Sequence, residues 1–169
     1  GKTKALECPN CGSGIDTIPG QAEHLVCPSC HAEVALTGDK AEVLKKHDEL
    51  KQISTTLQLG DVGTFDGVKW QIIGLMRVAE TGEEPDPPWI EYLLFNASKG
   101  FLWIVETNTE WTRTEVLNKL PETSGGSQVR LGGKAYTKKW SYGGEVLYAA
   151  GAFNWRVKIG DKTRITDYY

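Results

Sequence analysis

Cysteine and histidine are missing from residues 48–169, which make up most of the chain. A segment without these residues has no thiol nucleophile, no imidazole general base and no histidine ligand for a catalytic metal. Thiol catalysis, Ser-His-Asp chemistry and histidine-based metal catalysis are therefore excluded there. Carboxylates, hydroxyls and lysines are the reactive groups that remain.

Long hydrophobic runs are missing as well. No apolar stretch approaches the roughly 18–20 residues that a membrane-spanning helix needs. The start, GKTKALECPNC, lacks the apolar core of a signal peptide. We therefore expect a cytoplasmic protein without a membrane span. Its 169 residues, 40% hydrophobic and 24% charged, suffice for one ordinary domain with a small appended module.

All the cysteines stand near the start of the chain, in two C-x2-C pairs with fifteen residues between them: Cys8, Cys11, Cys27 and Cys30. This spacing is typical of a zinc ribbon, in which two knuckles supply four thiolates to one ion. A full ligand shell leaves no position for water, so one structural Zn²⁺ is predicted. Two disulfides are the alternative, and they need an oxidising compartment. His24 and His31 flank the second pair, and we expect them at the surface or behind the ligands.

The predicted zinc ribbon occupies residues 1–38 and is too short to build much of a core without its metal. A ribbon that binds nucleic acid normally carries a basic face, whereas this one has two lysines against four acidic residues. Docking to a protein, or structural capping, is the better interpretation. Because residues 59–169 contain no ligand, we expect them to unfold independently of the ribbon.

Residues 39–58 predict an amphipathic connecting helix of about four turns. Asp39 follows a glycine and would be the N-cap, with Glu42 three positions later. The expected apolar stripe consists of Val43, His47, Leu50, Ser54 and Leu57 on one face, widened by Leu44 and Ile53. The histidine on this stripe is expected to pack in an interface rather than to bind a metal.

From residue 59 onward, short β-rich runs alternate with turn residues. This pattern predicts an all-β barrel or sandwich over residues 59–169. Asp66-Gly67 separates two strand-like runs as a two-residue hairpin does, with both residues at positive φ. A second hairpin is expected around Gly160-Asp161.

The middle of this domain predicts a three-strand meander followed by a charge reversal. The expected strands are residues 89–96, 101–106 and 111–117, and a loop is expected at residues 81–88, which contain two adjacent prolines and three acids. The net charge of −3 is unevenly distributed. Residues 59–122 hold five basic and eleven acidic residues, whereas residues 123–169 hold eight basic and three acidic ones.

A family resemblance rests on the order of these motifs. The chain contains, in sequence, a CPNCG and CPSCH ribbon and then LGDVGTFDGVKWQIIG, WIEYLLF, FLWIVETNTEW and GKAYTKKWSYGGEVLYAAGAFNWRVKIGDKTRITDYY. Over residues 59–169 this order resembles the bacterial domain of unknown function 4178 (DUF4178), in which such a ribbon is a common companion. The family has no established activity. Its members tend to be encoded near membrane-associated and stress-type genes, so the resemblance implies an accessory role.

Glu91 is the carboxylate that the sequence singles out. Strand alternation places it on one face with Trp89, Leu93 and Phe95. On a buried face it needs a cationic partner, for which Arg77 or Arg113 are available, or its pKa rises. A structural ion pair, a solvent-facing position and a functional carboxylate all stay open.

The sequence therefore predicts a zinc-binding, non-enzymatic adaptor or binding protein with a protein partner. One rival is a binder of single-stranded nucleic acid or anions through the basic, aromatic C-terminal half, and another is an enzyme that uses Glu91. Binding of nucleic acid is not expected, because the ribbon and the first β half are acidic. Besides the zinc ligands, the candidate binding residues are Glu91, Tyr92, Trp103, Trp140, Lys138, Lys139 and Arg156.

Overall fold

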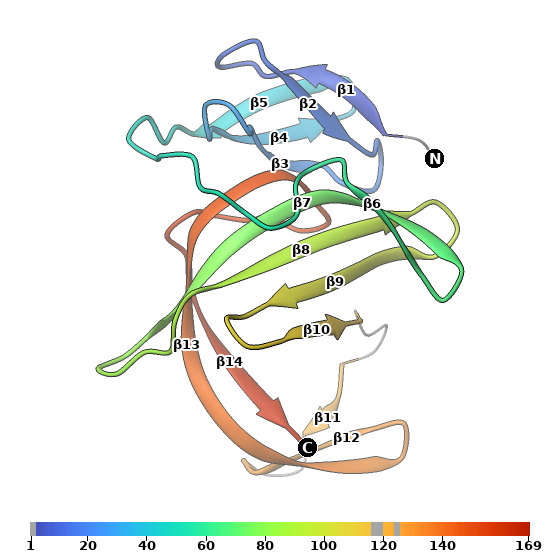
Figure 1. The fold of residues 1–169 in the computed structure, drawn as a ribbon, viewed down its shortest axis with the longest axis vertical. Helices are drawn as coiled ribbons and strands as arrows, with labels where there is room; N and C mark the ends of the chain where they lie inside the picture. Colours follow the sequence, from blue (N-terminus) through green and yellow to red (C-terminus); the bar gives the residue numbers. More distant parts are fainter. Residues whose placement is uncertain (1–2, 116–119, 124–125) are drawn as a thin grey trace.

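The computed structural model describes residues 3–115, 120–123 and 126–169, which form strands joined by turns and loops (Figure 1). In chain order the strands are β1 (Lys4–Glu7), β2 (Gly14–Thr17), β3 (His24–Val26), β4 (Glu33–Thr37), β5 (Lys40–Lys45), β6 (Val62–Phe65), β7 (Val68–Thr81), β8 (Trp89–Asn96), β9 (Gly100–Glu106), β10 (Trp111–Thr114), β11 (Glu122–Thr123), β12 (Gln128–Leu131), β13 (Lys134–Phe153) and β14 (Lys162–Tyr168). The predicted mainly β class is confirmed. Among the described residues there is no helix long and apolar enough to cross a membrane.

One large antiparallel sheet runs through the molecule in the order β10-β9-β8-β7-β13-β3-β4-β5. Off this path, β6 pairs with β7, β14 pairs with β13, and β12 joins the start of β13 together with β11. β1 and β2 form a hairpin of their own. The large sheet is strongly curved and remains open, with β10 and β5 at the two ends of its path (Figure 1).

β13 is the strand that holds this sheet together. Its 20 residues bend around the lower half of the molecule in Figure 1. One edge pairs with β7 from Gly143 to Gly151. The opposite edge pairs first with β14 and then, at Gly151–Phe153, with β3 of the cysteine-rich segment. The ribbon and the C-terminal β region therefore belong to one hydrogen-bonded sheet.

Several predicted turns and strands are present. Asp66 and Gly67 have φ values of 47° and 76° and connect β6 to β7 as a two-residue hairpin. The predicted meander is formed by β8, β9 and β10, and the acidic loop lies between β7 and β8. The prediction of a hairpin around Gly160-Asp161 is wrong about the segment with which the strand after this turn pairs. β14 follows this turn, but it pairs with the distant first half of β13 rather than with the residues just before the turn.

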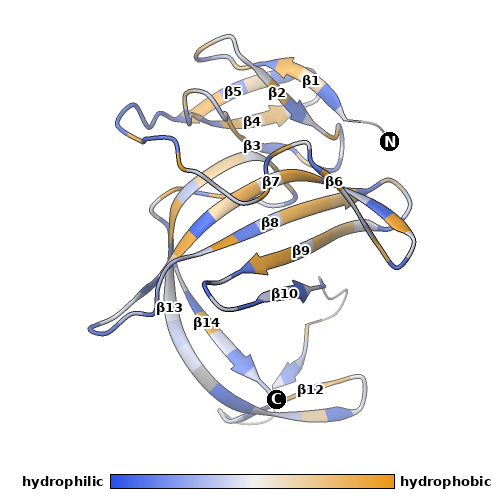
Figure 2. Cartoon of the chain, viewed as in Figure 1, coloured by the Kyte–Doolittle hydropathy of each residue, from blue (hydrophilic) through white to orange (hydrophobic). Residues whose placement is uncertain are grey.

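Side-chain alternation divides the core between the two faces of the sheet. The metal-side core contains Cys8, Cys27, Ile73, Met76, Leu93, Phe95, Trp103 and Phe153 among others. The linker-side core contains Trp70, Ile72, Leu75, Tyr92, Leu94, Leu102, Ile104 and Tyr148 among others. Figure 2 shows this hydrophobic content concentrated on β7, β8 and β9, whereas β14 and the first half of β13 are mostly hydrophilic.

The predicted connecting helix over residues 39–58 is wrong. Gly38, with a φ of 60°, and Asp39 form the turn of the β4–β5 hairpin, because Thr37 pairs with Lys40. The turn geometry of Gly-Asp, which satisfies the backbone within a hairpin, competes successfully with the N-cap interpretation. Residues 46–61 then run without regular structure.

The apolar residues of this linker are nevertheless buried, but with a strand-like period. Ile53, Leu57 and Leu59 are partly buried, whereas Ser54 and Gln58 are exposed. Leu50, Ile53, Leu57 and Leu59 pack against the linker-side core. In an extended segment, side chains alternate with a period of two, so every second residue reaches the sheet. The linker thus covers one face of the sheet without forming a helix.

Two glycines allow the close crossing of β7 and β13. Gly74 and Gly151 stand opposite each other in the ladder. A Cβ at Gly74 would lie 2.4 Å from the carbonyl oxygen of Ala152, and one at Gly151 would lie 2.3 Å from that of Ile73. Gly151 also has a φ of 97°. Backbone atoms cannot move aside as a flexible side chain can, so both positions require glycine.

We predict that Gly151→Ala lowers the free energy of unfolding by about 1–3 kcal/mol, because it adds both backbone strain and a clash. Urea denaturation followed by circular dichroism measures this change. Gly63→Ala is the matched control, since a Cβ at Gly63 meets nothing within 4 Å. Equal stability of the two variants would contradict the proposed role of the crossing.

Candidate functional site

The two C-x2-C segments fold into knuckles with the same backbone hydrogen bonds. In the first knuckle, Cys8 N donates to Ser13 O (2.7 Å) and Gly12 N donates to Cys8 O (2.8 Å). In the second, His31 N donates to Cys27 O at 2.9 Å. The residue after each pair has a positive φ, 80° at Gly12 and 63° at His31. These turns direct both cysteines of a pair toward the same point.

The four sulfur atoms form a cluster with the dimensions of a metal site. All ligand atoms of Cys8, Cys11, Cys27 and Cys30 lie within 4.8 Å of one another. The Sγ atoms of Cys8 and Cys30 are 3.8 Å apart, and those of Cys11 and Cys27 are 3.6 Å apart. Tetrahedral zinc with Zn–S bonds of about 2.3 Å requires S–S separations of about 3.8 Å. The cluster fits a metal ion and contains no disulfide.

The thiols of the cluster differ in their environments. Burial raises the pKa of Cys27 to about 12 and also raises the pKa of Cys8. A side-chain hydrogen bond with Ser13 lowers the pKa of the exposed Cys11 to about 6. Without a metal, the buried thiols thus keep their protons. A metal ion has to displace these protons, so its affinity rises with pH.

Neither histidine near the second knuckle belongs to the cluster. The buried His31 packs its ring edge-on against Tyr148, with a centroid separation of 5.3 Å. His24 begins β3 and pairs with Phe153. His47 donates from Nε2 to Oε2 of Glu33 at 2.5 Å, so it binds a carboxylate across an interface. His31 thus lies in the interior, and His47 lies in an interface between the linker and the ribbon.

Glu33 connects the ribbon to two other parts of the chain. Only 2% of this residue is exposed. One carboxylate oxygen accepts the hydrogen bond from His47 in the linker and another from the backbone N of Ile159, at 3.3 Å, in the loop between β13 and β14. Together with the β3–β13 ladder and the metal-side core, these bonds tie the ribbon to the rest of the molecule. The expectation of independent unfolding is therefore replaced by one of coupled unfolding.

We predict that the purified protein contains one zinc ion per chain and that Cys27→Ser removes it. Because Cys27 belongs to the metal-side core, the variant should also lower the unfolding midpoint of the whole chain. Elemental analysis and thermal unfolding measure these changes. Ser29→Ala is the control, since this exposed serine lies inside the same knuckle. Full zinc content in the Cys27 variant would contradict the prediction.

Glu91 lies on the metal-side face of β8, as alternation predicts, but without the predicted cationic partner. Trp89 Nε1 donates to Glu91 Oε1 at 3.2 Å. Arg113 instead pairs with Asp66 and Glu115, and Arg77 stands opposite Ile90, whose side chain packs on the other face. Burial raises the pKa of Glu91, and the indole hydrogen bond only partly opposes this rise. The carboxylate lines a pocket of about 310 Å³ together with Met76, Trp155, Arg156 and Lys158 among others.

We predict that Glu91→Gln stabilises the protein more at pH 7 than at pH 4. Glutamine keeps an acceptor for Trp89. A carboxyl whose folded pKa is raised favours folding fully only below its unfolded pKa, near 4.5, and loses this contribution as the pH rises through the folded pKa. Urea titrations at the two pH values measure the difference. Glu84→Gln in the exposed β7–β8 loop should show no such pH dependence. A destabilised Gln variant at pH 7 would instead support an ion pair.

The other predicted binding residues are spread over the molecule. Tyr92 is buried in the linker-side core, where its ring stacks on Trp111. Trp103 is 5% exposed and lies between the rings of Phe153 and Trp155. Both rings are thus occupied by packing and leave little surface for a nucleic-acid base.

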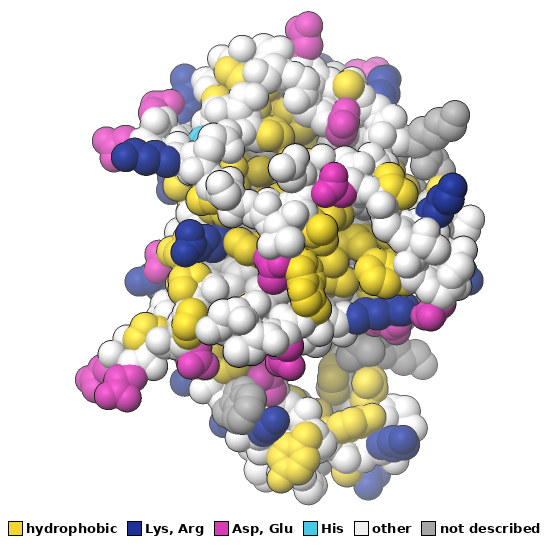
Figure 3. Space-filling view, viewed as in Figure 1, with side chains coloured by type: hydrophobic (Ala, Val, Ile, Leu, Met, Phe, Trp, Pro, Cys, Tyr) yellow, Lys and Arg dark blue, Asp and Glu magenta, His cyan; other side chains and the backbone are white. Residues whose placement is uncertain are grey.

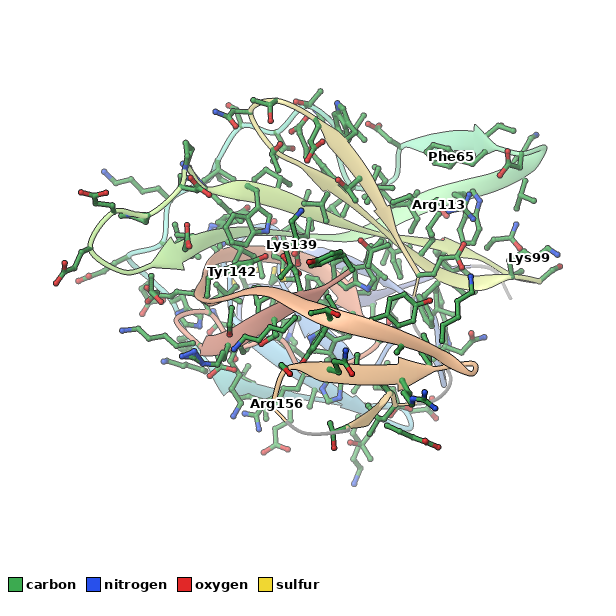
Figure 4. The ribbon with its side chains drawn as sticks, turned by 90° about the horizontal axis from the view of Figure 1, so that it is seen from below. Phe65, Lys99, Arg113, Lys139, Tyr142 and Arg156 are labelled. Carbon is green, nitrogen blue, oxygen red and sulfur yellow. The ribbon has the colours of Figure 1, made fainter. Side chains whose placement is uncertain are left out.

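The basic candidates come from two segments. Lys138 and Lys139 are exposed in the first half of β13, and Arg156 is exposed in the loop after it. Figure 4 labels Lys139 and Arg156. Trp140 belongs to β13 and pairs with Asp167, but its side chain lies outside the described residues. Of the predicted set, Glu91 and Arg156 line the same pocket.

Sequence reasoning missed a larger cleft beside Glu91, about 540 Å³ in volume. Its lining includes Trp89, Tyr142, Glu80, Asp86 and Glu110. The acidic loop between β7 and β8 is visible in the sequence and could have indicated one wall of this cleft. The contribution of Tyr142 on β13 could not have been found in this way. Tyr142 is separated from the loop by more than fifty residues and approaches it only because β7 pairs with β13.

Comparison with known proteins gives a family and no closer relative. The sequence model described as "Domain of unknown function (DUF4178)" matches residues 58–169. No curated protein matches the chain, and no solved structure does.

Proposed function

This chain belongs to the DUF4178 family of unknown function, and we propose that it is a zinc-binding, non-enzymatic adaptor with a protein partner. The observation that carries this proposal is the cysteine cluster at the junction of ribbon and sheet. Four thiolates would complete a tetrahedral shell around a metal ion, and a shell without an open position supplies structure rather than reactivity. In line with the family resemblance, the proposed setting is a bacterial membrane- or stress-associated system, with the protein in the cytoplasm as an accessory factor.

The role of the metal in this proposal is to fix the end of the sheet. Cys8, Cys11, Cys27 and Cys30 would hold the ion, which supplies cross-links between the two knuckles. β3 pairs with β4 along one edge and with Gly151–Phe153 of β13 along the other. A cross-linked ribbon keeps this short ladder, and with it the end of β13, in one conformation. A rigid sheet with preformed clefts suits binding, because little order has to be gained when a partner docks.

An enzyme that uses Glu91 is the second candidate, and the pocket of about 310 Å³ around this carboxylate favours it. A carboxyl whose pKa is raised by burial keeps its proton to a higher pH and can act as a general acid. The adaptor is preferred because the neighbouring Met76, Val78 and Val146 make this pocket mainly a packed, apolar site.

Affinity capture from the native cell tests the adaptor proposal. The full chain, Cys27→Ser and Glu91→Gln serve as three baits, each checked for folding, and nuclease-treated lysates test the nucleic-acid rival. We expect one protein to be enriched by the wild type and by Glu91→Gln in nuclease-treated lysate, and to be lost with Cys27→Ser. Loss of the captured protein after nuclease treatment would contradict the proposal. It would also be contradicted if the wild type, but not Glu91→Gln, converts a co-purified small molecule.

A further inference from the structure

The cleft of about 540 Å³ has two aromatic walls. Trp89 begins β8 and Tyr142 lies on β13, and both rings line the cleft. Their centroids are 6.3 Å apart and their planes meet at 79°. Trp89 is held in place by its hydrogen bond to Glu91. Two nearly perpendicular rings form a corner whose electron-rich faces attract a cation.

Carboxylates surround this corner on several elements. Glu80 is the penultimate residue of β7, Asp86 lies in the β7–β8 loop and Glu110 lies in the β9–β10 turn. Figure 3 shows acidic side chains gathered on the lower left of the visible face, where this loop and this turn project. Asp167 of β14 also lines the cleft. No lysine or arginine is among its described lining residues. Figure 4 shows Lys139 in the same part of the molecule as Tyr142, whereas Lys99 and Arg113 lie toward the opposite side.

The positions of these carboxylates are determined by the fold. Glu80 accepts a hydrogen bond from the backbone N of Asp86 at 2.8 Å, which closes the base of the β7–β8 loop. Thr107 accepts from the backbone N of Glu110 at 3.1 Å and donates to its carbonyl oxygen, which orders the opposite turn. The cleft is thus preformed on both sides.

A further negative group lies directly behind the aromatic corner. Glu91 is partly buried, and no arginine or lysine forms a salt bridge with it in the described part of the chain. Together with Asp167 and Glu80, it also raises the pKa of Tyr142, after the larger effect of burial. The carboxylates therefore act on the same ring that lines the cleft. A buried carboxylate without a counter-ion is costly, and a cation in the cleft would reduce this cost.

We propose that this cleft binds a cationic side chain, lysine or arginine, from a basic segment of the partner protein. The aromatic corner receives the charged head, and the carboxylates on the rim attract the neighbouring basic residues. This inference deepens the proposed adaptor function and rests on it. Several carboxylates surround the aromatic corner, so the cleft suits a ligand with more than one positive charge. A basic peptide segment is such a ligand.

Fluorescence polarisation with labelled tetralysine and tetraarginine peptides tests the inference at low salt. Two double variants make the same charge change at neighbouring sites. Glu80→Gln/Glu110→Gln removes two rim charges of the cleft, and Glu83→Gln/Glu84→Gln removes two exposed charges outside its lining. We expect the first pair to weaken binding about fivefold or more and the second by less than about twofold. Binding should be lost near 1 M salt, where screening acts over about 3 Å.

Tyr142→Leu separates the aromatic contribution from the charge. This variant keeps every carboxylate and should weaken binding about 2- to 30-fold. Thermal unfolding checks that it folds, and the two double variants decide the matter if it does not. Equal weakening by both double variants, or no binding to the wild type, would overturn the inference. If a partner is captured in the affinity experiment but no peptide binds, the adaptor function stands and this site is rejected. If peptides bind but no partner is captured, the cation-binding site stands and the adaptor function is rejected.

Discussion

The ladder between β13 and β3 is the interaction on which the rest of the architecture depends. Backbone N–H and C=O groups that leave water must find partners, and the end of β13 finds them at His24–Val26 of the ribbon. The crossing of Gly74 and Gly151 lets β13 leave β7 at the point where β3 joins. Three residue pairs thereby join a metal-binding module to a sheet that is built mainly from the rest of the chain.

This junction changes what the metal stabilises. A ribbon of this size has little core of its own, but Cys8 and Cys27 here share a core with Met76, Phe95 and Phe153. Glu33 adds polar bonds to the linker and to the loop after β13. Free energy from binding of a metal ion would therefore stabilise the sheet as well as the knuckles. The cysteine cluster lies in the ribbon, and the acidic cleft is lined by residues near the end of β7 and the start of β8. A metal ion held by the cluster would therefore stabilise the scaffold without touching the cleft.

Both faces of the sheet are covered, and this explains the unusual position of Glu91. On β8, the side chains that alternate with Tyr92 and Leu94 must enter the metal-side core, and Glu91 is one of them. Its hydrogen bond from Trp89 compensates only part of the desolvation. The same indole forms a wall of the neighbouring cleft. A carboxylate that weakens the core thus orients a ring on which the proposed binding site depends.

Local patterns in the sequence determined the features that neighbouring residues can form among themselves. The C-x2-C spacing identified the four cysteines that cluster, Asp66-Gly67 identified its hairpin, and alternation in residues 89–96 identified the two faces of β8. Turn geometry and a period of two are short-range properties. Tertiary structure alone decided three other points. The linker is extended because the linker-side core selects every second side chain, although a helical stripe could be drawn through the same residues. β14 pairs with the first half of β13, and Tyr142 meets Trp89, because a long curved strand brings distant segments together. Such contacts depend on the register of whole strands, which no short window of sequence contains.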